Sequence, residues 1–324
     1  MKRREFITLL GGAAAAWPLV AHAQQLRKLP HIGVLVSASP PHPFADALWR
    51  GLHSLGYSEG QNIKVEFRYT DGRSDRAAEL AVELVRSDVA VIVAHFTPAV
   101  RAAMAATKTI PIVMVAGAPL QSGFIKSLYE PGGNVTGLSA MDAELGGKRI
   151  QLLSDLIPKL ACVGVLATTL TTDPFSRPFV ADIQAAGSAL NVRVAPVLIG
   201  GPSELEEAFS VLAKEGAQAV IVQGFFGPYS KRIAQLATSH RIGYMSSDRS
   251  AVVDGGLTSI SANFPLLYEY AAVYVDKLLK GANPARLPVE QPSKFQVTVN
   301  SKTATALGLS LLPILLAQVD EVIE

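Results

Sequence analysis

Short apolar runs alternate with amphipathic segments from about residue 30 onward. The run HIGVLVSA at residues 31–38 indicates a buried strand, and the next segment repeats Phe44, Leu48 and Leu52 at helical spacing. The same alternation predicts further strands at 63–70, 89–95 and 110–117, with helices at 43–56, 74–87 and 98–108. Continuous apolar strands separated by helices are typical of a parallel sheet that is covered on both faces.

The alternation begins again after PGGNVTGLS, residues 131–139, and we interpret its glycine run PGGNVTG, residues 131–137, as a turn or hinge. Strands are predicted at 162–168, 192–199, 218–224 and 242–247, with helices near 143–156, 175–190, 203–215 and 229–239. The stretch from Leu307 to Val319 indicates a C-terminal helix packed on the body. Two similar α/β halves in one chain predict two lobes that face each other across a cleft.

Candidate binding residues follow the predicted strands, because open parallel sheets bind ligands beyond the carboxyl ends of their strands. In the first half these residues are Ser37, Ser39, His95, Phe96, Thr97 and Gly117. In the second half they are Thr168, Thr169, Asp173, Gln223, Phe225, Phe226 and Asp248. The set combines small hydroxyls with aromatic rings and few charges, which suits a small and partly apolar ligand.

Several of these candidates also have a purely structural interpretation. Thr97, Asp173 and Asp248 stand at predicted helix starts, where their side chains could cap free N–H groups. The aromatic candidates could be core residues, and the histidine could be a hydrogen-bonded residue near the surface. Phe225 and Phe226 are adjacent after a strand and cannot both point into one core face. We therefore expect at least one of these two rings to meet the cleft.

The first 23 residues predict an export signal. Three basic residues precede an apolar run at 6–20, and Ala21-His22-Ala23 has the small-x-small pattern of a signal-peptidase site. The pair Arg3-Arg4 also resembles a twin-arginine signal. The run is shorter than the roughly 20 apolar residues that a membrane span needs. We expect cleavage after Ala23 and a soluble, periplasmic mature protein; the alternative is an N-terminal anchor that is retained.

Composition and motifs argue against several classes of function. The 29 basic and 27 acidic residues become 26 of each once residues 1–23, with three basic residues and one acidic residue, are removed. Such a balance gives no reason to expect a nucleic-acid partner. The lone cysteine, Cys162, forms no internal disulfide and is predicted to be a small buried residue. No H-E-x-x-H, C-x-x-C, P-loop or G-x-S-x-G motif occurs, so we predict no catalytic, metal or cofactor site.

Three segments carry a resemblance to a known family. They are GLHSLGYSEGQNIKVEFRY at 51–69, PGGNVTGLS at 131–139, and the long segment from GGLTSISANF to TATALGL at 255–309. From about residue 30 to its end, the chain resembles the substrate-binding proteins of ABC transporters of the tryptophan/tyrosine type. The resemblance implies the type I periplasmic-binding-protein fold, with two Rossmann-like lobes, parallel sheets covered by helices, and a hinge around a cleft.

The resemblance also implies where the lobes begin and end. Hinge crossings are expected near Gly137–Met141, Ser247–Ser250 and Pro288–Pro292. The N-terminal lobe would then comprise 30–138 and about 249–288, and the C-terminal lobe 139–248 and about 289–324. The chain departs from many relatives at Ala118, where they carry Asp or Asn, and at Ile260-Ser261, where they carry Tyr-Gly.

The function implied is that of a monomeric receptor that captures a small molecule and delivers it to an ABC permease in the inner membrane. The candidate ligands are amino-acid-like or purine-like molecules, and no cofactor is expected. Two alternatives remain on the sequence alone. The chain could be a ligand-sensing module that reports to a membrane receptor, or an exported α/β enzyme.

Overall fold

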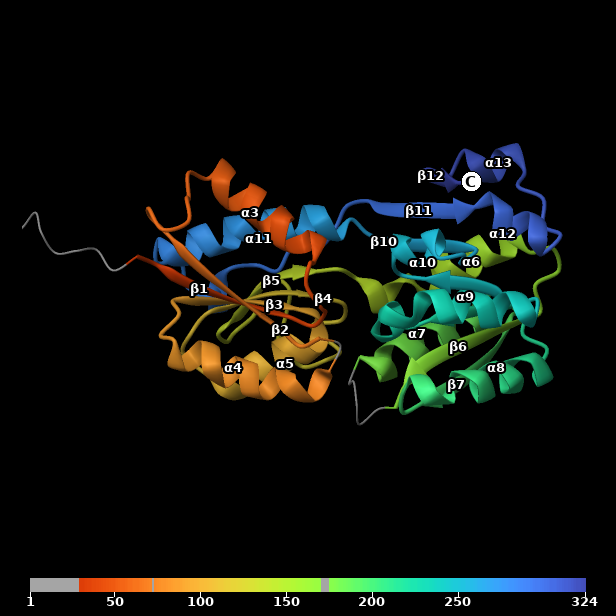
Figure 1. Cartoon of the computed structure of the whole chain (residues 1–324), viewed down its shortest axis with the longest axis horizontal. Helices are drawn as coiled ribbons and strands as arrows, with labels where there is room; N and C mark the ends of the chain where they lie inside the picture. The colour runs from red at the N-terminus through yellow and green to blue at the C-terminus, as the bar shows by residue number, and fades with distance from the viewer. Residues whose placement is uncertain (1–28, 72, 170–174) are drawn as a thin grey trace, which may run out of the picture.

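Two β-sheets form the cores of two lobes that lie end to end (Figure 1). The computed structural model describes residues 29–71, 73–169 and 175–324. The first lobe has a parallel sheet of order β2-β1-β3-β4-β5. Its strands are β1 (His31–Val36), β2 (Lys64–Tyr69), β3 (Val91–His95), β4 (Ile112–Ala116) and β5 (Val135–Ser139).

The second sheet has the order β12-β11-β10-β9-β8-β6-β7. Its strands are β6 (Cys162–Thr168), β7 (Arg193–Ile199), β8 (Ala219–Val222), β9 (Gly243–Ser246), β10 (Thr258–Ala262), β11 (Phe295–Asn300) and β12 (Glu321–Ile323). Strands β10 and β11 pair antiparallel, and the other pairs are parallel. The predicted α/β class with two mostly parallel sheets is confirmed.

Helices cover both faces of the first sheet. Helices α3 (Pro43–Ser54) and α11 (Phe264–Leu279) pack on one face, and α4 (Ala77–Arg86) and α5 (Phe96–Ala106) on the other (Figure 1). Strands β1, β3, β4 and β5 are buried along their whole length. Burial on both faces explains why β1, β3 and β4 consist mostly of consecutive apolar residues, whereas β5 is buried although it contains Thr136, Gly137 and Ser139.

The second sheet is covered in the same way. Its helices are α6 (Gly146–Leu156), α7 (Ser176–Ala189), α8 (Leu205–Lys214), α9 (Ser230–Ser239), α10 (Arg249–Val253), α12 (Ser301–Ala306) and α13 (Pro313–Leu316). Short 3₁₀ helices occur throughout the described chain rather than on this sheet alone. They are η1 (Ser74–Arg76), η2 (Asp142–Leu145), η3 (Pro202–Glu204), η4 (Gly224–Tyr229) and η5 (Pro284–Arg286). Cys162 is buried at the start of β6, as predicted.

The chain passes between the lobes three times. The first passage follows β5, and the third lies between α11 and β11. These two passages touch, because the N–H of Ser139 donates to the carbonyl of Glu290 at 2.9 Å and the N–H of Glu290 donates to Gly137 at 3.1 Å. The second passage lies at Asn263, between β10 in the second sheet and α11 on the first.

The second passage corrects the predicted boundary. Residues 249–288 were expected to belong to the first lobe, with a crossing near Ser247–Ser250. Helix α10 and strand β10 instead belong to the second lobe, because β10 pairs with both β9 and β11. The first lobe therefore receives α11 but not the segment 249–262.

Two further segments differ from the sequence analysis. The stretch Leu307–Val319 is not one helix: α12 ends at Ala306 and α13 covers Pro313–Leu316. Gly308, with φ of +75°, ends the first helix, and Pro313 can only start the next one. The segment 131–139 contains strand β5 as well as a turn. Gly137 is required there, because a β-carbon would lie 2.3 Å from the carbonyl oxygen of Met114.

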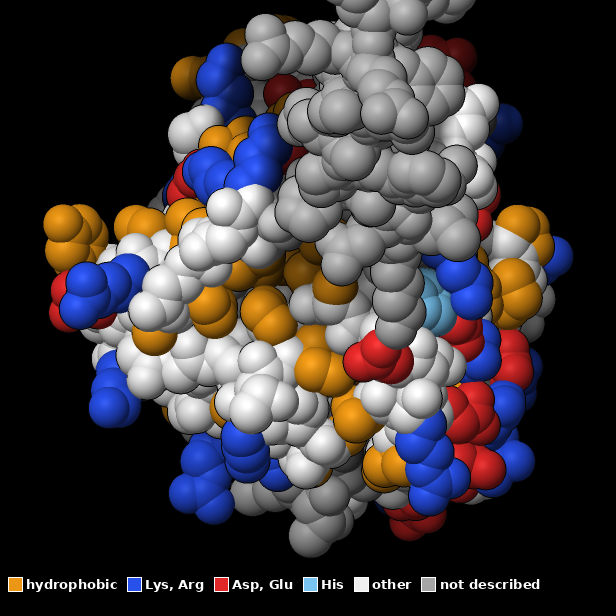
Figure 2. Space-filling view, turned by 90° about the vertical axis from the view of Figure 1, so that its left-hand side faces the viewer, with side chains coloured by type: hydrophobic (Ala, Val, Ile, Leu, Met, Phe, Trp, Pro, Cys, Tyr) orange, Lys and Arg blue, Asp and Glu red, His pale blue; other side chains and the backbone are white. Residues whose placement is uncertain are grey.

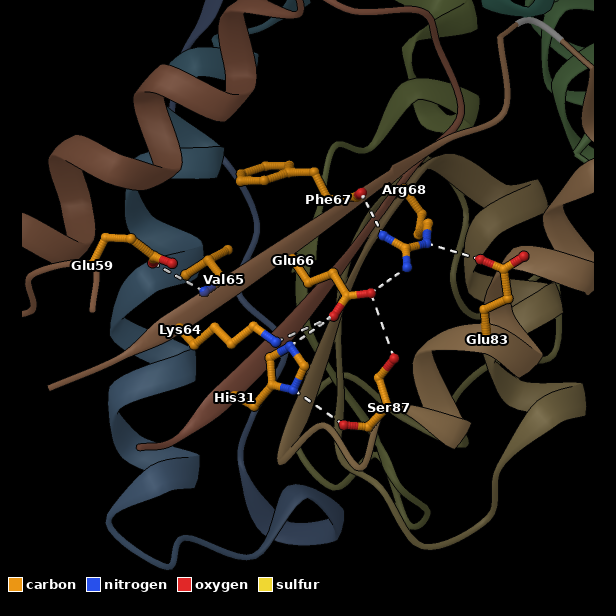
Figure 3. Close-up of polar contacts among 9 residues, drawn as sticks. All are labelled: His31, Glu59, Lys64, Val65, Glu66, Phe67, Arg68, Glu83 and Ser87. Carbon is orange, nitrogen blue, oxygen red and sulfur yellow. Dashed lines mark hydrogen bonds and ion pairs between the residues drawn. The ribbon is translucent and has the colours of Figure 1, made fainter. Parts of the chain in front are cut away.

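The far end of the first lobe carries acidic and basic side chains side by side (Figure 2). A network of charged side chains lies around the edge strand β2, where Arg68 pairs with Glu66 and Glu83, and His31 lies 2.9 Å from Glu66 (Figure 3). Charged side chains on an edge strand disfavour pairing with another chain. The network extends along β1, from His31 at its start to Arg68 opposite Leu35, and we assign it to protection of this edge.

Candidate ligand-binding site

A cavity of about 360 Å³ lies between the two lobes, at the carboxyl ends of their strands. Small-molecule sites have volumes of about 300–1,000 Å³. Aromatic rings line it from both sides: Phe44, Phe96 and Phe264 from the first lobe, and Phe175, Phe225 and Tyr229 from the second. Polar side chains also line it: Ser37, His42, Thr70 and Thr97 from the first lobe, and Asp142, Gln223, Ser247 and Asp248 from the second.

An aromatic cluster forms the first-lobe wall. The ring of Phe44 stacks on Tyr268, with 5.0 Å between centroids, and the ring of Phe96 meets Phe264 edge-on at 5.4 Å. Phe96 has a φ of +64°, a left-handed conformation that non-glycine residues adopt rarely and at some energetic cost. That conformation places its ring 3.7 Å from the ring of His95. The wall therefore offers a flat apolar surface at the start of α5.

His95 lies beneath this wall rather than on it. Its side chain is fully buried, and it is absent from the residues that line the cavity. Burial lowers the pKa of His95 well below its usual value, with a smaller effect from His42. The imidazole is therefore neutral, and it supports Phe96 and Phe44 from behind, with 5.2 Å between the Phe44 and His95 ring centroids.

The first lobe also presents neutral hydrogen-bonding groups to the cavity. The first turn of an α-helix leaves N–H groups without intrahelical partners, and the N-cap residue of α5 makes no side-chain hydrogen bond to them. Thr97 in that turn is 4% exposed and lines the cavity. The hydroxyl of Ser37 is buried in the wall and lacks a hydrogen-bond partner within the described structure. These groups form a surface that suits a carboxylate.

The second lobe places two polar side chains in the cavity wall that internal hydrogen bonds hold in position. The side-chain oxygen of Gln223 accepts hydrogen bonds from the N–H of Thr168 at 2.8 Å and from the hydroxyl of Ser176 at 3.0 Å. Asp248 accepts from the N–H of Ser250 at 2.8 Å and so caps α10 while it also lines the cavity. Capping and cavity lining were alternatives for Asp248 in the sequence, and the structure shows both.

Seven of the predicted residues come together in this cavity: Ser37, Phe96, Thr97, Gly117, Gln223, Phe225 and Asp248. Five others do not line it: Ser39 is exposed, Thr169 is half-buried outside the wall, and His95, Thr168 and Phe226 are fully buried. Phe226 packs in the core between β8 and α9, while the adjacent Phe225 faces the cavity. Asp173 lies outside the described residues.

Sequence reasoning missed several lining residues. His42 and Phe44 lie just beyond the first post-strand loop, where the helical spacing of Phe44 suggested only a packing role. Phe264 is the first residue of α11. From the sequence, this segment was assigned to the first lobe but was not predicted to line the cavity. Asp142 follows β5, and the glycine run that overlaps β5 had been interpreted as a turn or hinge rather than as a strand. Ala118 and Ile260-Ser261, where the chain departs from many relatives, are buried and do not line the cavity.

The two lobes are in contact around the cavity. The side-chain amide of Gln121, in the first lobe, donates to the Glu144 carboxylate of the second lobe at 3.0 Å. The ring of Phe175 packs directly against Gly117 and Ala118. The structure therefore shows a closed arrangement, in which both lobes line one cavity.

The fold and this shared cavity define a two-lobed ligand-binding protein. The chain matches the family model "ABC transporter substrate binding protein" over residues 32–323, and it belongs to that family. Substrate-binding proteins of this family bind ligands. None of the helices in the described ranges is both long and apolar enough to cross a membrane.

Two known proteins similar to this chain have ligands in their descriptions. A tyrosine-binding protein of Clostridioides difficile (strain R20291) is 28% identical over 292 residues, which cover 88% of this chain and 83% of that protein. A structure from Streptococcus pneumonia, described as an ABC domain in complex with L-Trp, has a TM-score of 0.85 at 25% identity. It covers 91% of this chain and 100% of that one. A conserved domain protein of Vibrio cholerae shares the fold, with a TM-score of 0.84 at 22% identity and the same coverage.

Proposed function

We propose that this protein is an exported receptor that closes on an aromatic amino acid and delivers it to an ABC importer. The observation that carries the proposal is the cavity between the lobes, which has aromatic rings on both walls. Neither lysine nor arginine is among its described lining residues. A flat apolar molecule that carries compensating charges fits such a surface better than an anion does.

Three parts of the cavity wall are suited to three different groups of an amino-acid ligand. The α5 start with Ser37 and Thr97 offers donors to a carboxylate, and the aromatic rings offer faces and edges to a ring. The second lobe offers carboxylates to an ammonium group. A ligand held by both lobes makes its full set of contacts only in the closed state, so it shifts the equilibrium toward closure.

The similar proteins support an aromatic amino acid over a purine. One is named for tyrosine and the other was solved with L-Trp. Family membership supports delivery to an importer, and the N-terminal segment supports export to the periplasm. We propose that the mature protein starts at Gln24 and acts as a soluble monomer beside the permease.

A thermal-shift panel tests this proposal. Residues 24–324 would be mixed with L-tryptophan, L-tyrosine and L-phenylalanine, and with adenine and citrate for comparison. A ligand at a hundred times its Kd stabilises the fold by about 2.7 kcal/mol, which raises Tm by several degrees for a chain of this size. We expect that rise with at least one aromatic amino acid and none with citrate. A rise with adenine alone would refute the proposed ligand class.

A further inference from the structure

Two carboxylates, Asp142 and Asp248, line the cavity among the described residues, and both belong to the second lobe. An amino-acid ligand needs an anionic partner for its ammonium group once water is excluded. The two candidates differ in burial, in orientation and in the hydrogen bonds that they already make. These differences distinguish their roles.

Asp142 is held in one orientation by a buried arginine. The guanidinium of Arg149 is fully buried and donates to the Asp142 carboxylate Oδ1 through Nη2. It also donates to the backbone carbonyl of Asp142 through Nη1, at 2.6 Å. The side chain of Asp142 is 13% exposed. Two hydrogen bonds from one rigid fork fix both the backbone and the carboxylate of Asp142 before any ligand arrives.

The other carboxylate oxygen has capacity left for a ligand. Oδ2 of Asp142 accepts from the hydroxyl of Ser247 at 3.4 Å, which is long beside the usual 2.7–2.8 Å for such a bond. A carboxylate can accept about four hydrogen bonds. Asp142 and Ser247 both line the cavity, so a donor on the ligand can approach Oδ2 from that side.

The surroundings of Asp142 are rich in negative charge. Asp142 and Asp182 both interact with the charge of Glu144, and Asp182 also interacts with the buried cation Arg149. Burial first, and then the charges of Asp182 and Asp142, raise the pKa of Glu144. A positive group placed beside Asp142 would offset this excess of negative charge.

Asp248 is less suited to the same task. It is exposed, and its Oδ1 already accepts from the N–H of Ser250 as the cap of α10. Exposed charges are screened by water and contribute little to binding. Asp248 thus lies at the edge of the site, whereas Asp142 lies inside it.

We propose that Asp142, oriented by Arg149, recognises the ammonium group of the ligand. This proposal rests on the proposed function, because it assumes an amino-acid ligand in the cavity. Asp142 follows the first passage between the lobes, and Met141 before it has a left-handed φ of +53°. A ligand bound there contacts the hinge itself, so recognition of the ammonium and closure of the lobes occur at one point.

Isothermal titration of paired ligands tests the role of Asp142. L-tryptophan and indole-3-propionate differ only in the ammonium group. Truncation of a buried, hydrogen-bonded charge partner lowers affinity about 30-fold or more. We expect Asp142→Asn to lose at least that factor for L-tryptophan and to bind indole-3-propionate as the wild type does. Asp248→Asn should lose less, and by the same factor for both ligands. Asp155→Asn, exposed on α6, is the matched control with wild-type affinity.

A second variant separates a loss of ligand binding from a loss of the fold. Asp142→Asn removes the carboxylate that forms an ion pair with the buried Arg149, whereas Asp142→Asn with Arg149→Met removes both members of that pair, an exchange that buried ion pairs often tolerate. Circular dichroism would verify its fold, and it should show the same selective loss for L-tryptophan. Equal losses for both ligands, or wild-type affinity for L-tryptophan in Asp142→Asn, would overturn this proposal alone. A wild type that binds no aromatic amino acid would overturn the proposed function.

Discussion

A β-carbon on Gly117 would lie 2.6 Å from Cε2 of Phe175, a residue of the opposite lobe. Carbon atoms in favourable contact are about 3.5–4.0 Å apart. The ring of Phe175 can therefore approach the first lobe this closely because Gly117 has no side chain. Gly117 is one of the places where the two lobes touch in the closed arrangement.

Gly117→Ala should hold the lobes apart and weaken ligand binding about 10-fold, as expected for overpacking at a tight contact. The fold of each lobe should be unaffected, because the clash arises between lobes. Titration of L-tryptophan with the variant measures this effect. Gly133→Ala is the control, since a β-carbon there meets no atom within 4 Å. Unchanged affinity in Gly117→Ala would show that this contact is not part of the bound state.

Phe225 and Phe226 should respond oppositely to truncation. Phe226→Ala removes a fully buried core ring, and we expect it to lower the free energy of unfolding by about 3–5 kcal/mol. Phe225→Ala removes a ring that faces the cavity, and we expect about a 10-fold loss of affinity with a smaller loss of stability. Chemical denaturation and titration on both variants separate the effects. A larger loss of affinity in Phe226→Ala would contradict the placement of these rings.

Glu144 should give the protein a pH dependence of known sign. Burial raises the pKa of Glu144 above its usual 4.5. The folded state then holds a proton that the unfolded chain releases, so stability falls as the pH rises from 4.5 through the raised pKa. We expect the Tm difference between Glu144→Gln and the wild type to move in favour of the variant between pH 4 and pH 7.

Calorimetry at several pH values measures that difference. The glutamine keeps an acceptor for the amide of Gln121, so the contact between the lobes survives the change. Glu207→Gln, exposed on α8, is the control and should track the wild type at every pH. A Glu144→Gln curve parallel to that of the wild type would contradict a raised pKa of Glu144 in the folded state.

Most strands and helices could be predicted because the sheets are buried on both faces. That burial leaves continuous apolar runs such as Val89–Ala94 in the sequence, and the helices between such runs keep the helical period. The second passage between the lobes could not be located in the same way. At Asn263 a strand ends and the side chain caps the next helix. Strand ends and helix caps occur at many strand-to-helix junctions, so they do not show which junction connects the two lobes.

Residues of the candidate site could be predicted from the sequence only where they lie in a loop that follows a recognised strand. Ser37, Thr97, Phe225 and Asp248 were found by that rule, and each lines the cavity. Asp142 was missed because its strand, Val135–Ser139, contains two small polar residues and a glycine and did not look buried. The pairing of β5 with β4 places Ser139 opposite Ala116, so the segment after β5 lies near the cavity residue Gly117.

Isothermal titration of the wild-type chain, residues 24–324, tests the central claim most directly. The protein would first be unfolded and refolded to remove any bound ligand, and then titrated with L-tryptophan and L-tyrosine at several temperatures. We predict one site per chain for at least one of them, with a negative heat-capacity change from burial of the aromatic ring. Absence of binding heat for every aromatic amino acid, with correctly refolded protein, would contradict the account.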